Sequence, residues 1–293
     1  MTLLTGKTIV VIGGDARNIE MMRQLVERDS LVYAVGFEEV DAQIEGVYFS
    51  TLENIPANQI DAVILPVSGL DEEGYAESHY AESSPMVQPE FFDTLSENCL
   101  VFTGIMTPLL SRLSEKIKII PLFDRDDVAI YNSIPTAEGA LMFAIQHTDF
   151  TVHDANVTII GFGRVGKTLV HTFSALGANV SVCSRNEDEL ARIFEYHAKP
   201  VHIEDLDSSV ENCNILVNTV PQLVVQPSTI RSLPLDSLII DLASKPGGVD
   251  FRFAKKRGIK AILAPGLPGM VAPNTAGKIL ARVIQSVILK QES

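Results

Sequence analysis

The chain has 293 residues, of which 46% are hydrophobic and 20% are charged, and its formal net charge is −14. This composition is typical of a globular protein of two domains, and the negative charge argues against nucleic acid as a partner, because phosphate binding needs clustered Lys and Arg. The three cysteines (Cys99, Cys183, Cys213) form no C-x-x-C pair and the six histidines no H-E-x-x-H motif, so we expect a reducing compartment and no metal site.

The first half of the chain alternates apolar runs with helical or loop material, a pattern that predicts a parallel sheet. The expected strands are 8–12, 31–35, 62–65, 100–102 and 118–121. The chain starts without a basic or apolar leader, and we expect no apolar stretch long enough for a bilayer, so we predict a cytoplasmic protein without membrane contact. The acidic stretch 71–93 is predicted to be a mobile excursion over the sheet, suited to act as a lid.

Polar residues after these strands are candidates for binding a small anion. Gly13-Gly-Asp-Ala-Arg17 lacks the third glycine of a dinucleotide turn, but Arg17 and the free N–H groups of the following helix could cradle a carboxylate. Ser68 and Thr103 follow two other strands, at the edge where open α/β sheets bind ligands. Each of these residues could equally be a turn, cap or surface residue.

A helix is predicted over 133–147, leading directly into the second half of the chain. Ser133 can cap it, Pro135 is tolerated in its first turn, and Glu138 suits the positive end of the helix dipole. Arg125, in the loop before it, is expected to face the ligand cleft as a cation for an anionic substrate.

The strongest motif is Val157-Thr-Ile-Ile-Gly161-Phe-Gly163-Arg-Val-Gly166, a β-branched run that ends in G-x-G-x-x-G and gives way to a helix. Gly161 permits the sharp turn, Gly163 lets the backbone approach a pyrophosphate, and Gly166 lets helix and strand pack closely. We therefore predict dinucleotide binding here, with Arg164 and Val165 as further contacts. A glycine turn that is only structural is the alternative.

The end of the next strand, 180–183, favours NADP over NAD. NAD sites place Asp or Glu there to bind the ribose hydroxyls, whereas this chain has Ser184-Arg185-Asn186. Arg185 could pair with a 2′-phosphate, and a charge-assisted contact of about 1.5–3 kcal/mol shifts the preference about ten- to a hundredfold. The alternative is NAD, with Glu187 or Asp188 reaching the ribose.

Three later strand ends are expected to line the nicotinamide half of the site. The residues concerned are Asn218, Thr219, Val220 and Pro221 after the first, Asp241, Ala243, Ser244 and Lys245 after the second, and Pro265-Gly266-Leu-Pro268-Gly269 after the third. The last helix is amphipathic and is expected to pack back on the first domain.

These elements predict an α/β protein of two doubly wound parallel-sheet domains joined by a linker helix. Residues 1–134 are the expected substrate domain, completed by helix 274–293, and residues 135–273 the expected NADP-binding Rossmann domain.

Five strings spread over nearly the whole chain carry a family resemblance. They are Gly13-Gly-Asp-Ala-Arg17, Arg125-Asp-Asp-Val-Ala-Ile-Tyr-Asn-Ser-Ile-Pro-Thr-Ala-Glu-Gly139, Ala144-Ile-Gln-His-Thr-Asp149, Asp241-Leu-Ala-Ser-Lys-Pro-Gly-Gly248 and Leu263-Ala-Pro-Gly-Leu-Pro-Gly-Met-Val-Ala-Pro273. Together they resemble the A-subunit family of dipicolinate synthases from spore-forming bacteria, within a formate/glycerate dehydrogenase-like architecture. The resemblance implies an oxidoreductase that converts dihydrodipicolinate to dipicolinate with NADP⁺ in the mother-cell cytoplasm during sporulation, together with a flavoprotein B subunit. We also expect a homo-oligomer.

Within this interpretation Arg17 and Arg125 hold the two substrate carboxylates, assisted by Ser68 and Ser133. Asn218, Thr219, Ser244 and Lys245 shape the nicotinamide pocket, and His147, Glu138 and Lys245 are candidates for the base. Two alternatives stay open: an alanine-dehydrogenase-like or hydroxy-acid NAD(P) dehydrogenase, and a non-catalytic scaffold protein that binds NADPH.

Overall fold

A computed structural model describes residues 3–41, 44–244 and 246–291. The chain divides into two compact units: unit 1 comprises residues 1–131 and 272–293, and unit 2 comprises residues 132–271. Both divisions fall a few residues before the predicted limits of 134 and 273. Lys245, one of the predicted site residues, lies outside the described residues.

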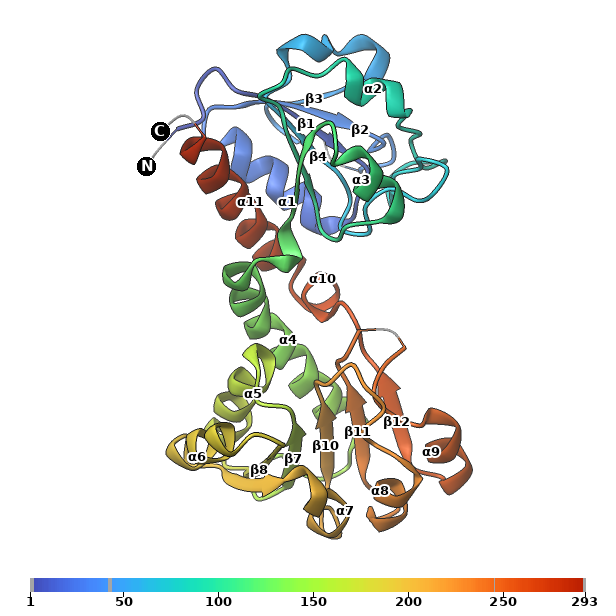
Figure 1. The fold of residues 1–293 in the computed structure, drawn as a ribbon, viewed down its shortest axis with the longest axis vertical. Coiled ribbons are helices and arrows are strands. Elements are labelled where there is room, and N and C mark those ends of the chain that lie inside the picture. Colours follow the sequence, from blue (N-terminus) through green and yellow to red (C-terminus); the bar gives the residue numbers. More distant parts are fainter. Residues whose placement is uncertain (1–2, 42–43, 245, 292–293) are drawn as a thin grey trace. The chain divides into compact units, whose positions relative to one another are not determined.

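Unit 1 contains a six-stranded parallel sheet with strand order β3-β2-β1-β4-β5-β6 (Figure 1). In its centre, Val10 of β1 lies opposite Tyr33 of β2 and Val63 of β4. The strands are β1 (Thr8–Ile12), β2 (Leu31–Val35), β3 (Val47–Phe49), β4 (Ala62–Ile64), β5 (Leu100–Thr103) and β6 (Lys118–Pro121). The helices are α1 (Ala16–Val26), η1 (Leu52–Asn54), η2 (Ala57–Gln59), α2 (Pro89–Asp93), α3 (Pro108–Leu113), η3 (Leu122–Asp124) and α11 (Pro273–Lys290).

Both faces of this sheet are covered. Ile9 and Val11 of β1 pack in one apolar layer with residues of α1 and α11, while Val10 and Ile12 pack in the opposite layer with residues of α2 and α3. Figure 1 shows α1 and α11 side by side, and they meet closely at Gly277, where a Cβ would lie 2.4 Å from the Arg17 carbonyl oxygen. The last helix therefore belongs to the core of unit 1, as its amphipathic pattern predicted.

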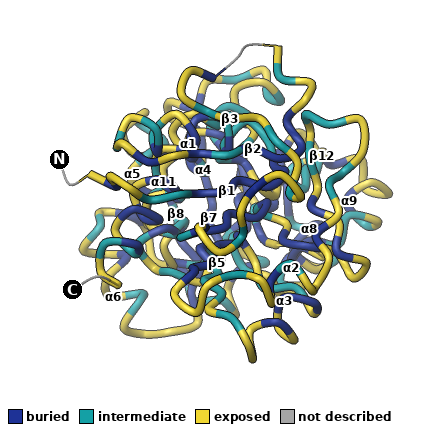
Figure 2. Tube along the Cα trace, turned by 90° about the horizontal axis from the view of Figure 1, so that it is seen from above, coloured by how far each residue is buried: buried dark blue, intermediate teal, exposed yellow. Residues whose placement is uncertain are grey.

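Unit 2 repeats this plan with the order β12-β11-β10-β7-β8-β9. The central strands β1 and β7 are both buried over most of their length (Figure 2). The strands of unit 2 are β7 (Asn156–Ile160), β8 (Asn179–Ser184), β9 (Lys199–His202), β10 (Ile215–Asn218), β11 (Leu238–Asp241) and β12 (Lys260–Leu263). Its helices are α5 (Arg164–Ala175), α6 (Glu187–Glu195), η4 (Ile203–Asp205), α7 (Leu206–Ser209), α8 (Pro227–Ser232), α9 (Phe251–Arg257) and α10 (Leu267–Val271).

Numbered within its own unit, each sheet has the order 3-2-1-4-5-6, which is that of a doubly wound dinucleotide-binding fold. Apolar layers cover both faces in unit 2 as well. The predicted fold class, two doubly wound parallel α/β sheets, is confirmed.

The helix at the division of the units, α4 (Asp126–His147), starts earlier than predicted. Asp126 and Asp127 occupy its first turn, where negative charge is favourable, and Pro135 lies inside the helix. Ser133 is therefore no N-cap: it is 1% exposed, and its Oγ lies 2.6 Å from Thr168 Oγ1 of α5.

Length and composition make α4 a possible membrane span, the one such helix among the described residues, so the expectation that no stretch is long enough was wrong. One such helix is weak evidence for a membrane, because buried core helices have the same composition. Three alanines of α4, Ala137, Ala140 and Ala144, are buried in the apolar core of unit 2.

The segment 71–93, predicted as a mobile excursion, is attached to the sheet of unit 1. Gly14 N donates to Glu77 O over 2.7 Å, and His79 N donates to Gly14 O over 2.9 Å. Ala76, in the same segment, is fully buried. These contacts bring the middle of the segment to the carboxyl end of β1.

Candidate functional site

The turn between β7 and α5 has the shape that the glycine motif predicts. Gly161 has a φ of +95°, which favours glycine, and a Cβ on Gly166 would lie 2.1 Å from the Gly161 carbonyl oxygen. At Gly163 a Cβ would meet nothing within 4 Å. The turn is thus closed where the helix packs on the strand and open at the glycine that a pyrophosphate would approach.

The N-terminus of α5 is also suited to an anion. Gly163 is its N-cap, and no side chain of the described residues caps this 12-residue helix. The first-turn N–H groups of a helix need partners, and the helix dipole favours negative charge there. A phosphate group supplies both an acceptor and a charge.

A pocket of about 390 Å³ lies beside this turn in unit 2. Eight of the predicted cofactor residues line it: Gly161, Gly163, Ser184, Arg185, Asn186, Thr219, Val220 and Pro221. Seven others were not predicted: Ile160, Phe162, Cys183, Glu189, Ile203, Gln222 and Val224. The pocket does not include Arg164, Val165, Gly166, Asn218, Asp241, Ala243 or Ser244.

Glu189 is the most consequential of the residues that were not predicted. Ser184 Oγ donates a short hydrogen bond to Glu189 Oε2 and accepts one of 3.1 Å from Asn186 N. Glu187 and Asp188, the two acids suggested by sequence spacing, are exposed and do not line the pocket. A carboxylate therefore reaches this end of the pocket, but from slightly later in α6.

Asn218 and Asp241 hold the neighbouring strand ends in place. Both are fully buried, and Asn218 Nδ2 donates to Asp241 Oδ1 over 2.8 Å. Asp241 also accepts from Ala243 N (3.1 Å) and Gly248 N (2.7 Å). Their side chains thus position the loops after β10 and β11 rather than point into the pocket.

Cys183 lines the same pocket with an uncharged side chain. Burial raises the pKa of its thiol to about 12, so the group stays protonated near pH 7. A protonated, buried thiol is a poor nucleophile and behaves as a small apolar side chain.

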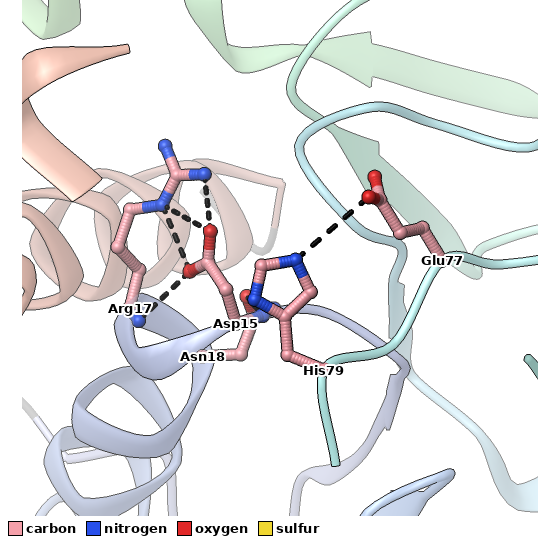
Figure 3. A network of polar contacts seen from close by, with 5 residues as sticks. All are labelled: Asp15, Arg17, Asn18, Glu77 and His79. Atoms are coloured by element: carbon pink, nitrogen blue, oxygen red, sulfur yellow. Dashed lines mark hydrogen bonds and ion pairs between the residues drawn. The ribbon is translucent and has the colours of Figure 1, made fainter. Parts of the chain in front are cut away.

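Unit 1 has a smaller pocket, of about 190 Å³, at the carboxyl ends of β1 and β4. It brings together two predicted substrate residues, Arg17 and Ser68, with Asp15, Glu77 and His79, which were not predicted (Figure 3). No local motif marks Glu77 or His79, because their place depends on the attachment of the segment 71–93. The other lining residues are Gly14, Pro66, Val67 and Ile105.

Asp15 organises this pocket. Its carboxylate accepts from Arg17 Nε (2.9 Å) and Arg17 Nη2 (2.5 Å), and it caps α1 by accepting from Arg17 N (2.9 Å). Asn18 completes a capping box. The expectation that the N–H groups of α1 are free for a ligand was therefore wrong. Burial opposes ionisation of Asp15, but the bonds from Arg17 outweigh it and lower the pKa.

The remaining candidates lie outside these pockets. Arg125 Nη2 is paired with Asp127 Oδ2 at 2.8 Å, and Thr103 Oγ1 donates to Ile105 O over 3.0 Å. Glu138 is exposed on α4, and the His147 ring stacks on Phe143. The structure therefore brings Arg17 and Ser68 together and assigns no shared pocket to Arg125, Ser133 or Glu138.

Comparisons with known proteins agree with this geometry. Residues 8–123 match the family of N-terminal domains of the dipicolinate synthase A subunit, and residues 132–292 match the family "Alanine dehydrogenase/PNT, C-terminal domain". The second match replaces the formate/glycerate dehydrogenase-like label suggested by the sequence and identifies a nicotinamide-nucleotide-binding, dehydrogenase-type fold.

One curated relative and two solved structures cover nearly the whole chain. The A subunit of dipicolinate synthase from Bacillus subtilis (strain 168) is 45% identical over 288 residues, which are 98% of this chain and 97% of the relative. The crystal structure of the A subunit from Bacillus halodurans has a TM-score of 0.93 at 45% identity, covering 98% of this chain and 99% of the other. The crystal structure of the Bacillus subtilis protein has a TM-score of 0.94 at 44% identity, covering 99% and 98%. The chain therefore belongs to the A-subunit family of dipicolinate synthases.

Proposed function

We propose that this protein oxidises dihydrodipicolinate to dipicolinate with NADP⁺ as hydride acceptor. The observation that carries the proposal is the 45% identity, over 98% of the chain, to a protein named as the A subunit of dipicolinate synthase. The name of that relative supports a second component, which we take to be a flavoprotein B subunit. We place the reaction in the mother-cell cytoplasm of a sporulating bacterium.

Unit 2 is proposed to hold the dinucleotide. The open backbone at Gly163 and the N-terminus of α5, which no described side chain caps, fit a pyrophosphate. Arg185 lines the pocket and is proposed to pair with the 2′-phosphate of NADP. Glu189 bears on the same choice, because a carboxylate near the ribose favours unphosphorylated hydroxyls.

Unit 1 is proposed to hold the substrate. The pocket of about 190 Å³ exceeds the cavity of about 150 Å³ that admits a benzene ring, so one substituted six-membered ring is a suitable occupant. Arg17 bonds to Asp15 through Nε and Nη2, and its Nη1 makes no hydrogen bond to the described residues. Nη1 and the Ser68 hydroxyl are the proposed donors to one carboxylate. Arg125 of unit 1 remains a proposed partner of the other carboxylate, whereas Ser133, 1% exposed in unit 2, is not.

The chemistry needs orientation more than strong acid–base assistance. A ring carbon of the dihydropyridine gives up a hydride to the nicotinamide, a neighbouring ring position gives up a proton, and the remaining electron pair completes an aromatic pyridine. The bound cofactor supplies the hydride acceptor, and aromatisation makes the step favourable. The residues of this chain bind and orient the diacid and accept the proton.

A direct assay tests the proposal. Purified protein is mixed with dihydrodipicolinate and NADP⁺, alone and with the flavoprotein partner, and NADPH formation is followed by its absorbance. Alanine and 2-hydroxy acids are the comparison substrates, because unit 2 matches an alanine dehydrogenase domain. NADPH formation from dihydrodipicolinate supports the proposal, turnover of alanine instead favours the dehydrogenase alternative, and activity only with the partner favours a scaffold role.

A further inference from the structure

The pocket of unit 1 contains a histidine that has no part in the proposed binding of the carboxylates. His79 and Glu77 line it together with Asp15, Arg17 and Ser68. Figure 3 shows the imidazole between the Asp15–Arg17 pair on one side and Glu77 on the other. A side chain of the type most often used for proton transfer in catalysis thus lies in the pocket proposed for the substrate.

The main chain fixes where His79 lies. His79 N donates to Gly14 O over 2.9 Å, and Gly14 N donates to Glu77 O over 2.7 Å, so residues 77–79 are bound to the glycine turn after β1. Ser78 Oγ donates to Gly36 O over 2.5 Å, and the next ring, Tyr80, stacks on Phe37 at 6.0 Å. Positioning by backbone and packing on both sides is what a catalytic side chain requires.

The neighbouring groups favour a proton-accepting role for the imidazole. His79 Nε2 lies 3.8 Å from Glu77 Oε1, so a protonated ring gains an ion-pair partner. Asp15 is a poor acceptor, because Arg17 engages its carboxylate and its pKa is lowered. Among the described residues, the charged side chains that line the pocket with His79 are Glu77 and the paired Asp15 and Arg17.

We propose that His79 is the base that accepts the proton released when the dihydropyridine ring is oxidised, and that Glu77 stabilises the resulting imidazolium. The inference rests on the proposed function. One C–H bond of the ring breaks, and its hydrogen leaves with both electrons as a hydride to NADP⁺. A second bond to hydrogen, at a neighbouring ring position, also breaks heterolytically. Its proton moves to the imidazole, and its electron pair becomes part of the aromatic ring. The proton then passes to solvent, to which the side chain is 62% exposed.

An imidazole suits this step better than the other candidates for the base. Histidine is the side chain most often used for general acid–base catalysis, because its ring nitrogen can both accept and release a proton. Glu138 belongs to the other unit and lines neither the 190 Å³ pocket nor the 390 Å³ pocket, and the His147 ring stacks on Phe143. His79 is the one histidine that lines the described pocket of Arg17 and Ser68.

The test compares His79→Gln, Glu77→Gln and the control His153→Gln, an exposed histidine of unit 2. We expect kcat for dihydrodipicolinate oxidation to fall about 10²-fold in His79→Gln and less in Glu77→Gln, and to stay unchanged in the control. Calorimetric binding of dipicolinate by His79→Gln should stay within a few-fold of wild type, which shows that the variant is folded. The acid limb of the wild-type pH–kcat profile should disappear in His79→Gln, and added imidazole should restore part of the rate of His79→Ala.

Two negative results have different meanings. If the wild-type protein, with its partner present, forms no NADPH from dihydrodipicolinate, the proposed function is wrong and the inference falls with it. If wild type is active but His79→Gln keeps its kcat and its acid limb, only the assignment of His79 is overturned. A His79→Ala variant with a large kcat defect that imidazole leaves unchanged likewise contradicts proton transfer.

Discussion

After the first strand of each sheet the chain turns through glycines into a helix, and the two turns differ in what they leave accessible. In unit 2 a Cβ at Gly163 would meet nothing within 4 Å, and no described side chain caps α5. In unit 1 a Cβ at Gly13 would lie 2.6 Å from Glu77 O, and Asp15 caps α1. The same strand order thus produces one turn with an accessible backbone and one with an occupied backbone.

This difference separates two kinds of recognition. An accessible turn offers N–H groups and a helix dipole, which suit any phosphate. An occupied turn offers side chains instead, here Arg17 at the start of α1 and His79 from the segment bound to Gly14. A shared strand order therefore does not imply a shared ligand. The groups that occupy the turn after the first strand decide which ligand can bind there.

The largest effect is expected at Asp241, which keeps the strand ends of unit 2 in place. Asp241→Ala leaves Asn218 Nδ2, Ala243 N and Gly248 N without this acceptor in a buried site. We expect the free energy of unfolding to fall by about 3 kcal/mol. Urea unfolding measures the change, with the exposed Asp236→Ala as control. A loss below about 1 kcal/mol would show that the network is dispensable.

Two glycines of the accessible turn should separate binding from folding. Gly163→Ala should lower NADPH affinity at least about tenfold, or about 1.4 kcal/mol, with little change in stability, because the methyl group occupies the approach of the phosphate. Gly166→Ala should destabilise the fold by about 1–3 kcal/mol, because its Cβ would lie 2.1 Å from Gly161 O. Calorimetric titration and thermal unfolding give the two readouts. Unchanged NADPH binding by Gly163→Ala would contradict an accessible turn.

The choice between the two dinucleotides should depend on Arg185 and Glu189. Arg185→Ala should lower the preference for NADP over NAD about ten- to a hundredfold through loss of a charge-assisted contact. Glu189→Gln should move the preference the other way, because it removes a negative charge beside Ser184. The kcat/KM ratio for the two cofactors measures both, and Arg192→Ala, whose exposed side chain pairs with Glu195, is the control. An unchanged ratio in Arg185→Ala would exclude this arginine as the phosphate partner.

The smallest effect is expected in the occupied turn, where Asp15 makes the cap. Asp15→Ala should cost about 1 kcal/mol of stability at pH 7. Because the pKa of Asp15 is lowered in the folded state, its contribution is present above the unfolded pKa of about 3.9 and is lost as the pH falls through the folded value. The difference between wild type and Asp15→Ala should therefore shrink below about pH 4, as measured by urea unfolding at about pH 7 and about pH 3. A constant difference would contradict the ion pair with Arg17.

Local patterns predicted most of the fold. The buried strands β1, β2, β10 and β11 were predicted because each is an uninterrupted apolar run. The edge strands β3 and β9 were missed, since their residues are largely exposed and resemble loops. The start of α4 was misplaced because Pro135 was taken as a first-turn proline, whereas the helix continues through it.

The candidate sites could be predicted where their residues are close together in the sequence, and not where residues distant in the sequence meet. The glycine turn and Ser184–Asn186 could be predicted, because strand, turn and helix are consecutive in the sequence. Glu77 and His79 could not, since hydrogen bonds to Gly14 bring them to the carboxyl end of β1 from a distant part of the chain. Glu189 depends on the orientation of α6, which no spacing rule encodes.

The packing of α11 against α1 also has a consequence for how the protein is made. Leu280 and Ile284 complete an apolar layer that contains Ile9 and Val11, so this layer stays incomplete until residues that follow all of unit 2 have been synthesised. Unit 2, by contrast, is one uninterrupted stretch of chain and has all its strands well before that point. Domains generally fold as units during synthesis. Unit 1, whose first strand is translated before unit 2, can therefore complete its apolar layer only after unit 2 has been synthesised.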